Sequence, residues 1–94
     1  MIGAEKEGQK IAVEIKSFIG HSKLHDLYNA LGQYVLYSPA LNRQEADRKL
    51  YLAIPKSAYE FFFSDPIAQE IVKSNNLRFI VFDPKEEKIV LWID

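Results

Sequence analysis

Helical segments alternate with short apolar runs along this sequence, and this alternation limits the fold more than any other feature. The runs "KLYLAIP" (49–55) and "LRFIVFD" (77–83) each follow a segment with helical spacing. Two strands joined by a helix pair in parallel through a right-handed crossover. The run "KIVLWID" (88–94) follows directly after the turn "PKEE", so it adds an antiparallel strand. The sequence predicts a small α/β fold, a mixed β-sheet flanked by helices in the order β-α-β-αα-β-β.

The spacing of apolar residues predicts the individual elements. A strand is expected over 10–17, with residues 1–4 as the stub of a strand pairing back onto it. A helix is expected from about 22 to 40, with Ser22 as N-cap and Pro39 near its end. Within it, Leu27, Leu31 and Val35 are predicted to pack toward the sheet. The charged segment "NRQEADR" that follows is predicted to be a loop or a frayed helix end.

The second half of the chain is predicted to hold two short helices and a hairpin. The segments "KSAYEFFFSD" and "PIAQEIVKSNN" have helical spacing, and Pro66 suits the first turn of the second helix. The run Phe61–Phe63 cannot face one way on a helix, so one ring is expected to be exposed or in an interface. The runs 79–82 and 89–93 are almost continuously apolar, which is typical of central strands covered on both faces.

Length and composition bound the class of protein. Ninety-four residues, 48% of them hydrophobic, make one domain over 1–94. The lack of cysteine excludes disulfides and thiolate zinc sites. No apolar run is long enough to span a bilayer, so we expect a soluble, cytoplasmic protein without a membrane partner. The formal net charge of −1 provides no global basic field, so DNA binding would require a local cluster or metal ions.

The strand "KIAVEIKSF" (10–18) carries two charges on one face. Side chains alternate along a strand, so Ile11, Val13 and Ile15 share one face, while Glu14 and Lys16 share the other. An acid followed two positions later by lysine is typical of metal-dependent nucleases. The carboxylate and the intervening backbone carbonyl hold Mg²⁺, and the lysine helps to orient or deprotonate the attacking water. The alternative is a solvated, structural ion pair.

Spacing alone does not choose between these alternatives. Eight Glu and nine Lys in 94 residues should give about one such spacing by chance. Glu86 and Lys88 have the same spacing, but they lie in the expected turn of the last hairpin, without apolar alternation before them. Context therefore favours Glu14 and Lys16 as the candidate pair.

The first helix carries a second candidate pair. Gln33 and Tyr37 are four residues apart, so they project from one helical face, and Gly32 beside them permits close packing. An ordinary amphipathic helix with a polar flank gives the same spacing. A strand ending in E-x-K, followed by a crossover helix with Q-x-x-x-Y, is the order found in RecB-like PD-(D/E)-x-K nucleases. We expect Gln33 and Tyr37 to face the same cleft as Glu14.

Several stretches resemble one family across essentially the whole chain. "AEKEGQKIAVEIKSF", "ALGQYVLY", "LYLAIP", "YEFFF" and "DPKEEKIVLWI" resemble the XisH family, the fdxN element excision controlling factors of cyanobacteria. The resemblance implies a restriction-endonuclease-like fold and a role in the regulated excision of a DNA element, beside a recombinase and an XisI-like protein. It implies a Mg²⁺ ligand at Glu14, with the Ile15 carbonyl beside it, a catalytic lysine at Lys16, and Gln33 and Tyr37 as helix residues of the site.

The chain departs from that pattern before its first predicted strand. PD-(D/E)-x-K sites need a further acid from a preceding strand, and the first aspartate here is Asp26. The resemblance implies a core lacking its usual N-terminal helix and strand, with weakened Mg²⁺ affinity. The alternative function is a non-catalytic regulatory module that keeps the fold and binds an XisI-like partner. We also expect an open backbone edge along 10–18 and, because of it, a homodimer or a larger complex.

Two histidines form one further motif. His21 and His25 are four residues apart near the start of the first helix, a spacing that can ligate zinc. No third ligand is evident, although Asp26 is adjacent, so a solvated helix start is the better interpretation.

Overall fold

The computed structural model describes residues 2–16 and 22–94 as a five-stranded mixed sheet with three helices. In chain order the elements are β1 (Ile2–Lys6), β2 (Gln9–Ile15), α1 (Lys23–Gln44), β3 (Lys49–Pro55), α2 (Lys56–Ser64), α3 (Pro66–Ser74), β4 (Phe79–Asp83) and β5 (Lys88–Ile93). The sheet order is β1-β2-β3-β4-β5. The predicted α/β fold, with a small mixed sheet and helices, is confirmed.

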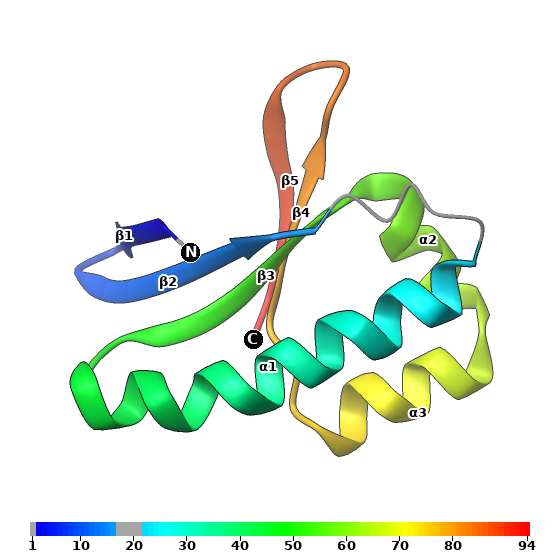
Figure 1. Cartoon of the computed structure of the whole chain (residues 1–94). Helices are drawn as coiled ribbons and strands as arrows, with labels where there is room; N and C mark the ends of the chain where they lie inside the picture. Colours follow the sequence, from blue (N-terminus) through cyan, green and yellow to red (C-terminus); the bar gives the residue numbers. More distant parts are fainter. Residues whose placement is uncertain (1, 17–21) are drawn as a thin grey trace.

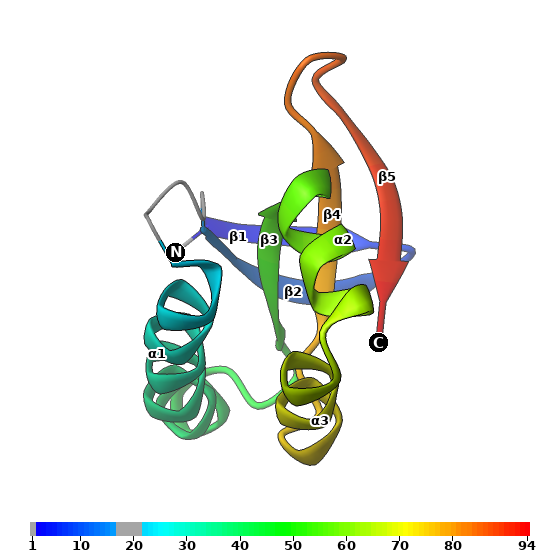
Figure 2. The same cartoon turned by 90° about the vertical axis from the view of Figure 1, so that its right-hand side faces the viewer.

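All three helices cover the same face of the sheet (Figures 1 and 2). Parallel pairing joins β2 to β3 across α1, and β3 to β4 across α2 and α3. Crossovers between parallel strands are right-handed. The face of the sheet that a crossover helix covers therefore depends on whether the next strand lies to one side of the previous strand or to the other. Here β2, β3 and β4 are added in one direction, and both crossovers therefore pass over one face.

The main core lies between this face and the helices. Buried residues of β2, β3 and β4 contact buried residues of all three helices, and Phe62 of α2 packs against Phe79 of β4 with ring centroids 5.9 Å apart. Of the three consecutive phenylalanines, Phe62 is buried and Phe63 is 68% exposed, which confirms that they do not all face one way. The core residues include Ala12, Leu27, Ala30, Tyr34, Leu52, Ile54, Ala58, Ala68 and Val81.

The opposite face has a smaller core made by strands alone, within the described part of the chain. Tyr51, Ala53 and Ile80 are buried in its floor. Toward its margins Ile15 is 57% exposed and Ile89 is 50% exposed. The prediction that 89–93 forms a central strand covered on both faces is therefore wrong. β5 is an edge strand, because it pairs only with β4, and no described helix packs over this face.

Helix α1 differs from the prediction in its length and in its buried side. Ser22 caps it as expected, since its hydroxyl accepts a hydrogen bond from the His25 N–H at 3.1 Å. The helix continues through Pro39 to Gln44, although proline removes one intrahelical hydrogen bond. Leu27 is buried, and Leu31 packs against the core as predicted. Val35 is 54% exposed, so its predicted packing is wrong, and Ala30, Tyr34 and Tyr37 lie on the covered side instead.

Strand β2 is paired on both sides. The predicted stub forms β1, whose residues Ile2 to Lys6 pair antiparallel with β2 from Val13 to Gln9. The connecting residues Glu7 and Gly8 both have positive φ, which suits a two-residue hairpin turn. On the other side β2 pairs with β3. The expectation of an open backbone edge is therefore wrong for residues 10–13, and residues 17 and 18 of the expected range lie outside the described residues.

Within residues 2–16 and 22–94, no helix has both the length and the apolar character needed to cross a membrane.

Candidate functional site

Glu14 and Lys16 form an ion pair at the carboxyl end of β2. The Lys16 ammonium lies 3.7 Å from a Glu14 carboxylate oxygen, and the two side chains are only 22% and 18% exposed. Ile11, Val13 and Ile15 line the opposite face, which confirms the predicted alternation. The Lys16 N–H donates to the Ala53 carbonyl at 2.9 Å, so the backbone of the pair continues the ladder with β3. The pair thus lies at the end of β2, on the helix-covered side.

The second E-x-K pair in the sequence has a different environment. Glu86 and Lys88 lie 2.7 Å apart, and each side chain is 60% exposed. An exposed pair of this kind contributes little to stability and is screened by salt. The Glu14–Lys16 pair is less exposed, so its charges interact in a lower effective dielectric. The two pairs therefore differ in exposure, and the choice of Glu14 and Lys16 as the functional pair stays a prediction.

Gln33 and Tyr37 of α1 are both half-buried. The Tyr37 side chain packs against the core under the helices. The Gln33 carbonyl oxygen, Oε1, is buried and has no hydrogen-bond partner among the described residues. Buried polar atoms are nearly always paired, so an unpaired one calls for an explanation such as an absent ligand. That Gln33 and Tyr37 share a cleft with Glu14 stays a prediction.

The donor set for a divalent ion is small. The Glu14 carboxylate and the Ile15 backbone carbonyl are hard oxygen donors of the kind that Mg²⁺ prefers. The adjacent Lys16 ammonium competes with a cation for that carboxylate. Across residues 2–16 and 22–94, no three His, Cys, Asp or Glu side chains are grouped so that they could hold a metal ion. The residues that the structure describes do not make a complete Mg²⁺ site.

Other candidate ligands are used differently or lie elsewhere. Asp83 ends β4, and its carboxylate accepts hydrogen bonds from the N–H groups of Glu86 and Lys85 in the following turn. These two hydrogen bonds, that from Glu86 foremost, hold the pKa of Asp83 below its ordinary value. Asp83 is therefore a turn-capping residue. The predicted histidine pair cannot be compared, because His21 lies outside the described residues.

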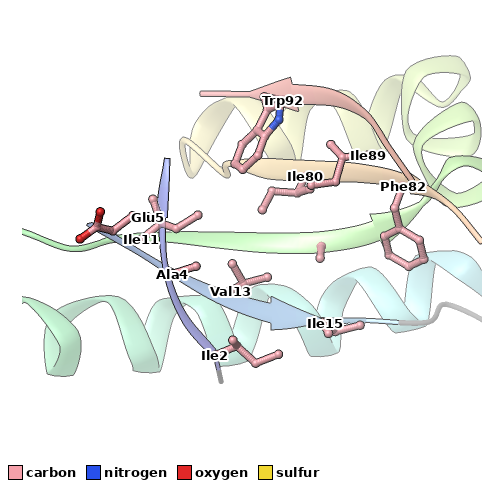
Figure 3. A pocket seen from close by; sticks show the side chains of 11 residues that line it. Ile2, Ala4, Glu5, Ile11, Val13, Ile15, Ile80, Phe82, Ile89 and Trp92 are labelled. Carbon is pink, nitrogen blue, oxygen red and sulfur yellow. The ribbon is translucent and has the colours of Figure 1, made fainter. Parts of the chain in front are cut away.

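An apolar groove on the other face was missed by sequence reasoning. It has a volume of about 500 Å³ and is lined by side chains of all five strands (Figure 3). We call this the helix-free groove, and its main lining residues are Ile2, Val13, Ile15, Phe82, Ile89 and Trp92. The alternation along 10–18 indicated part of this apolar surface, because it assigned Ile11, Val13 and Ile15 to one face. The missing information was which face the helices cover.

One end of the helix-free groove is closed by contacts between the two edge strands. The Lys6 ammonium of β1 lies 4.5 Å from the centre of the Trp92 ring on β5, and 3.9 Å from the Asp94 carboxylate. In the floor beneath, the Tyr51 hydroxyl donates a hydrogen bond to Asp94, and its ring packs edge-on against Trp92. The first and last strands of the sheet therefore meet there, and the sheet is curled.

Two pKa values reflect this closed end. Burial, followed by the hydrogen bond to Asp94, raises the pKa of Tyr51 to about 12. The same hydrogen bond, aided by the charges of Lys6, Lys49 and Arg78, holds the pKa of Asp94 below its ordinary value. At neutral pH the pair is therefore a neutral phenol that donates to a carboxylate.

Comparison with known proteins places the chain in a family. A family model described as XisH protein matches residues 1–90. An XisH family protein from Nostoc punctiforme has 40% sequence identity and a TM-score of 0.91, over 98% of this chain and 73% of that chain. A fdxN element excision controlling factor protein from Anabaena variabilis has 43% identity and a TM-score of 0.91, over 98% and 72%. No curated protein matches the sequence. Because the family model spans nearly the whole sequence, this chain belongs to the XisH family.

Proposed function

We propose that this chain is a controlling factor in the excision of a DNA element, and that it acts as a nuclease-like module of an excision assembly in the cytoplasm. In this proposal it does not cut DNA on its own. Support for the first part comes from family membership and from the similar Anabaena variabilis protein, a fdxN element excision controlling factor. The second part rests on the Glu14–Lys16 pair.

The single carboxylate of that pair is the observation that carries the proposal. A metal-dependent phosphodiesterase must hold a cation whose charge stabilises the transition state, and this requires several oxygen ligands. Glu14 supplies one carboxylate, and the Lys16 ammonium lies 3.7 Å from it, where it competes with a cation. Among the described residues, no three His, Cys, Asp or Glu side chains are grouped so that they could hold a cation. A structural ion pair on the covered face of the sheet accounts for these contacts.

The proposed partners are DNA, a recombinase and an XisI-like protein, all of which come from the family resemblance. The chain has 12 basic and 13 acidic residues and a formal net charge of −1. Affinity for DNA grows with the number of phosphates that Lys and Arg neutralise. A chain without a basic excess is expected to contact DNA weakly by itself, so the assembly would supply most of the affinity.

A second candidate function is a metal-dependent DNA nuclease of the PD-(D/E)-x-K type. The buried Gln33 Oε1 without a partner among the described residues favours it, because an unsatisfied buried acceptor is uncommon and a catalytic role is one explanation for it. In this case Glu14 and the Ile15 carbonyl would hold Mg²⁺, Lys16 would orient the nucleophile, and Tyr37 would flank Gln33. A further acid would have to come from outside the described residues.

DNA nicking by the purified chain tests the two candidates against each other. Supercoiled plasmid is incubated with Mg²⁺ or Mn²⁺ and with the wild type, Glu14→Gln, Lys16→Gln or the exposed control Glu86→Gln. We expect no nicking above the protein-free background for any of them. We also expect no heat of Mg²⁺ binding at millimolar concentration. Nicking that disappears in Glu14→Gln and Lys16→Gln but persists in Glu86→Gln would overturn the non-cutting proposal and establish the nuclease.

A further inference from the structure

We propose that two copies of this chain associate through the outer side of α1, the row of exposed residues between Tyr28 and Ala40 that faces away from the sheet. A homodimer was expected from an open edge of β2, but residues 10–13 of that strand pair with β1. The inference concerns a different surface and goes beyond the proposed function. Self-association and DNA nicking are measured separately, so failure of either proposal leaves the other intact.

The outer side of α1 lacks the charged residues that a solvent-facing helix normally carries. Residues 27–42 include no Asp, Glu, Lys or Arg, although these make up 27% of the sequence. The exposed residues within 28–40 are Tyr28, Asn29, Gly32, Val35, Leu36, Pro39 and Ala40. Three of them are large apolar side chains between 50% and 72% exposed, namely Tyr28, Val35 and Leu36. A contiguous uncharged surface of this kind marks an interaction site.

The other two helices have the usual charged outer side, although all three helices cover the same face of the sheet (Figure 2). Helix α2 exposes Phe63 and α3 exposes Ile67. Each of these lies one helical turn from an exposed glutamate, Glu60 or Glu70. The uncharged surface is therefore a property of α1 and not of the whole helical layer.

Gly32 lies at the centre of this surface. Ala30 and Tyr34, two positions before and after it, are buried. Two residues turn a helix by about 200°, so Gly32 faces directly away from the core. Among the described residues, no atom other than the adjacent helix backbone lies within 4 Å of where its Cβ would be. Glycine is less favourable than alanine inside a helix, and the close approach of another backbone accounts for its use here.

The spacing of the row makes it complementary to itself. Tyr28 lies four positions before Gly32, and Leu36 lies four positions after it. When two α1 helices pack antiparallel about a two-fold axis at Gly32, Tyr28 of each copy meets Leu36 of the other. The two glycines face each other, so the helices approach closely. One patch serves both copies, and such a contact closes as a dimer.

Electrostatics also favour a second copy as the occupant. Two identical charged surfaces repel each other, because like charges in contact oppose association. Residues 27–42 carry no charge, so this repulsion does not arise. In an antiparallel pair, the positive N-terminal end of each helix also lies beside the negative C-terminal end of the other. Self-association therefore meets no electrostatic penalty on this surface.

The size of the surface indicates a weak dimer. Residues 28–40 form a row about 20 Å long. The smallest specific interfaces bury about 1,000 Å² in total, or about 500 Å² from each partner. Seven exposed residues, of which Gly32 and Ala40 are small, supply an area of that order. We therefore expect a dissociation constant in the micromolar range.

Sedimentation equilibrium from ~1 µM to ~200 µM measures this association, and we expect a monomer–dimer equilibrium for the wild type. Tyr28→Lys and Leu36→Glu each place a charge against an apolar side chain of the other copy. Each should weaken dimerisation at least ~10-fold. The matched controls are Ile67→Glu on α3, at a position 57% exposed, and Ile89→Lys in the helix-free groove, at a position 50% exposed. Both should dimerise as the wild type does.

A mixture of the two α1 variants tests the antiparallel pairing. In a mixed dimer, the lysine introduced by Tyr28→Lys lies opposite the glutamate introduced by Leu36→Glu, and the second contact between these positions keeps its natural residues. Neither new charge has a charged neighbour within 27–42 of its own helix. We expect an equimolar mixture to recover most of the affinity that each variant loses alone.

Gly32→Gln separates a loss of contact from a loss of folding. Glutamine is a better helix former than glycine, so the dilute monomer should melt about 2–5 °C higher than the wild type. Its side chain blocks the close approach of the helices and should weaken dimerisation at least ~10-fold. Dilute Tyr28→Lys and Leu36→Glu should melt near the wild type, because both side chains are already exposed in the single chain.

Three results would overturn the inference. These are a wild type that stays monomeric up to ~200 µM, a dimer that all three α1 variants leave intact, and a mixture that associates no better than either variant alone. A dimer that Ile89→Lys disperses and Leu36→Glu does not would assign self-association to the helix-free groove and reject the outer side of α1.

Discussion

The two faces of the sheet differ in how their apolar residues are covered. On the helix-covered face Leu52 and Ile54 are 0% exposed, because three helices pack over them. On the helix-free face only the floor, such as Tyr51 at 2%, is buried, while Ile15 and Ile89 at the margins are half-exposed. The difference follows from strand order, since strands added in one direction place every right-handed crossover on one side. The sheet thus has a core covered by helices on one face and an exposed apolar groove on the other.

The largest expected effect comes from truncating equivalent apolar residues on the two faces. Leu52→Ala on the covered face should lower the free energy of unfolding by about 2–5 kcal/mol, because it leaves a cavity. Ile89→Ala on the open face should lower it by less than about 1 kcal/mol, because that side chain is already half in water. Urea unfolding of both variants checks this. Equal losses would mean that the helix-free face is also covered in solution.

Most of the fold could be predicted from the sequence, because it depends on local patterns. The turn "PKEE", Pro66 at the start of α3 and the Ser22 cap each fix an element through short-range chemistry. Strand order has no local signal, and this is why 89–93 was misplaced as a covered central strand. Val35 was misassigned for a related reason. Which side of an amphipathic helix faces the sheet depends on how the helix is docked.

The candidate site could be predicted only in part. The alternation along 10–18 placed Glu14 and Lys16 together on one face, and they form an ion pair. It gave no information about the exposure of the pair or the unpaired Gln33 oxygen, because both depend on tertiary packing. The groove on the other face needs five strands to form it, and no single stretch of sequence contains that information.

The second expected effect concerns the charged pair on the covered face. Glu14→Gln or Lys16→Gln alone should lower the free energy of unfolding by about 1–2 kcal/mol, since each leaves a mostly buried charge with a weaker partner. The double variant should lose less than the sum of the two singles, as contacting residues do. The exposed pair Glu86 and Lys88 should show coupling below about 0.5 kcal/mol. Additive losses at Glu14 and Lys16 would contradict a structural ion pair.

The third effect appears only at alkaline pH and concerns the floor of the open face. The folded state raises the pKa of Tyr51 to about 12 from 10.0, so the folded protein holds this proton more tightly than the unfolded chain. The resulting stabilisation is fully present below pH 10 and is lost as the pH rises toward 12. Tyr51→Phe lacks it. The advantage of the wild type over Tyr51→Phe in urea unfolding should therefore shrink from pH 10 to pH 12, and a constant difference would contradict the assignment.

The smallest expected effect is on the stability of the surface variants. Ile89→Lys in the groove and Leu36→Lys on the outer side of α1 replace side chains that are 50% and 72% exposed. Each should change the free energy of unfolding by less than about 0.5 kcal/mol, because little buried contact is lost. Thermal melts of the two variants check this. A large loss for Ile89→Lys alone would show that the groove is filled within the free chain.

Our central claim is that the Glu14–Lys16 pair stabilises the fold and does not cut DNA. The most direct test is the excision frequency of a DNA element in a reporter strain in which variants of this chain replace the wild type. We predict that the double variant Glu14→Gln/Lys16→Gln retains excision within ~2-fold, as the exposed control Glu86→Gln/Lys88→Gln does. Loss of excision in Glu14→Gln/Lys16→Gln at normal protein levels, with full excision in the exposed control, would contradict it.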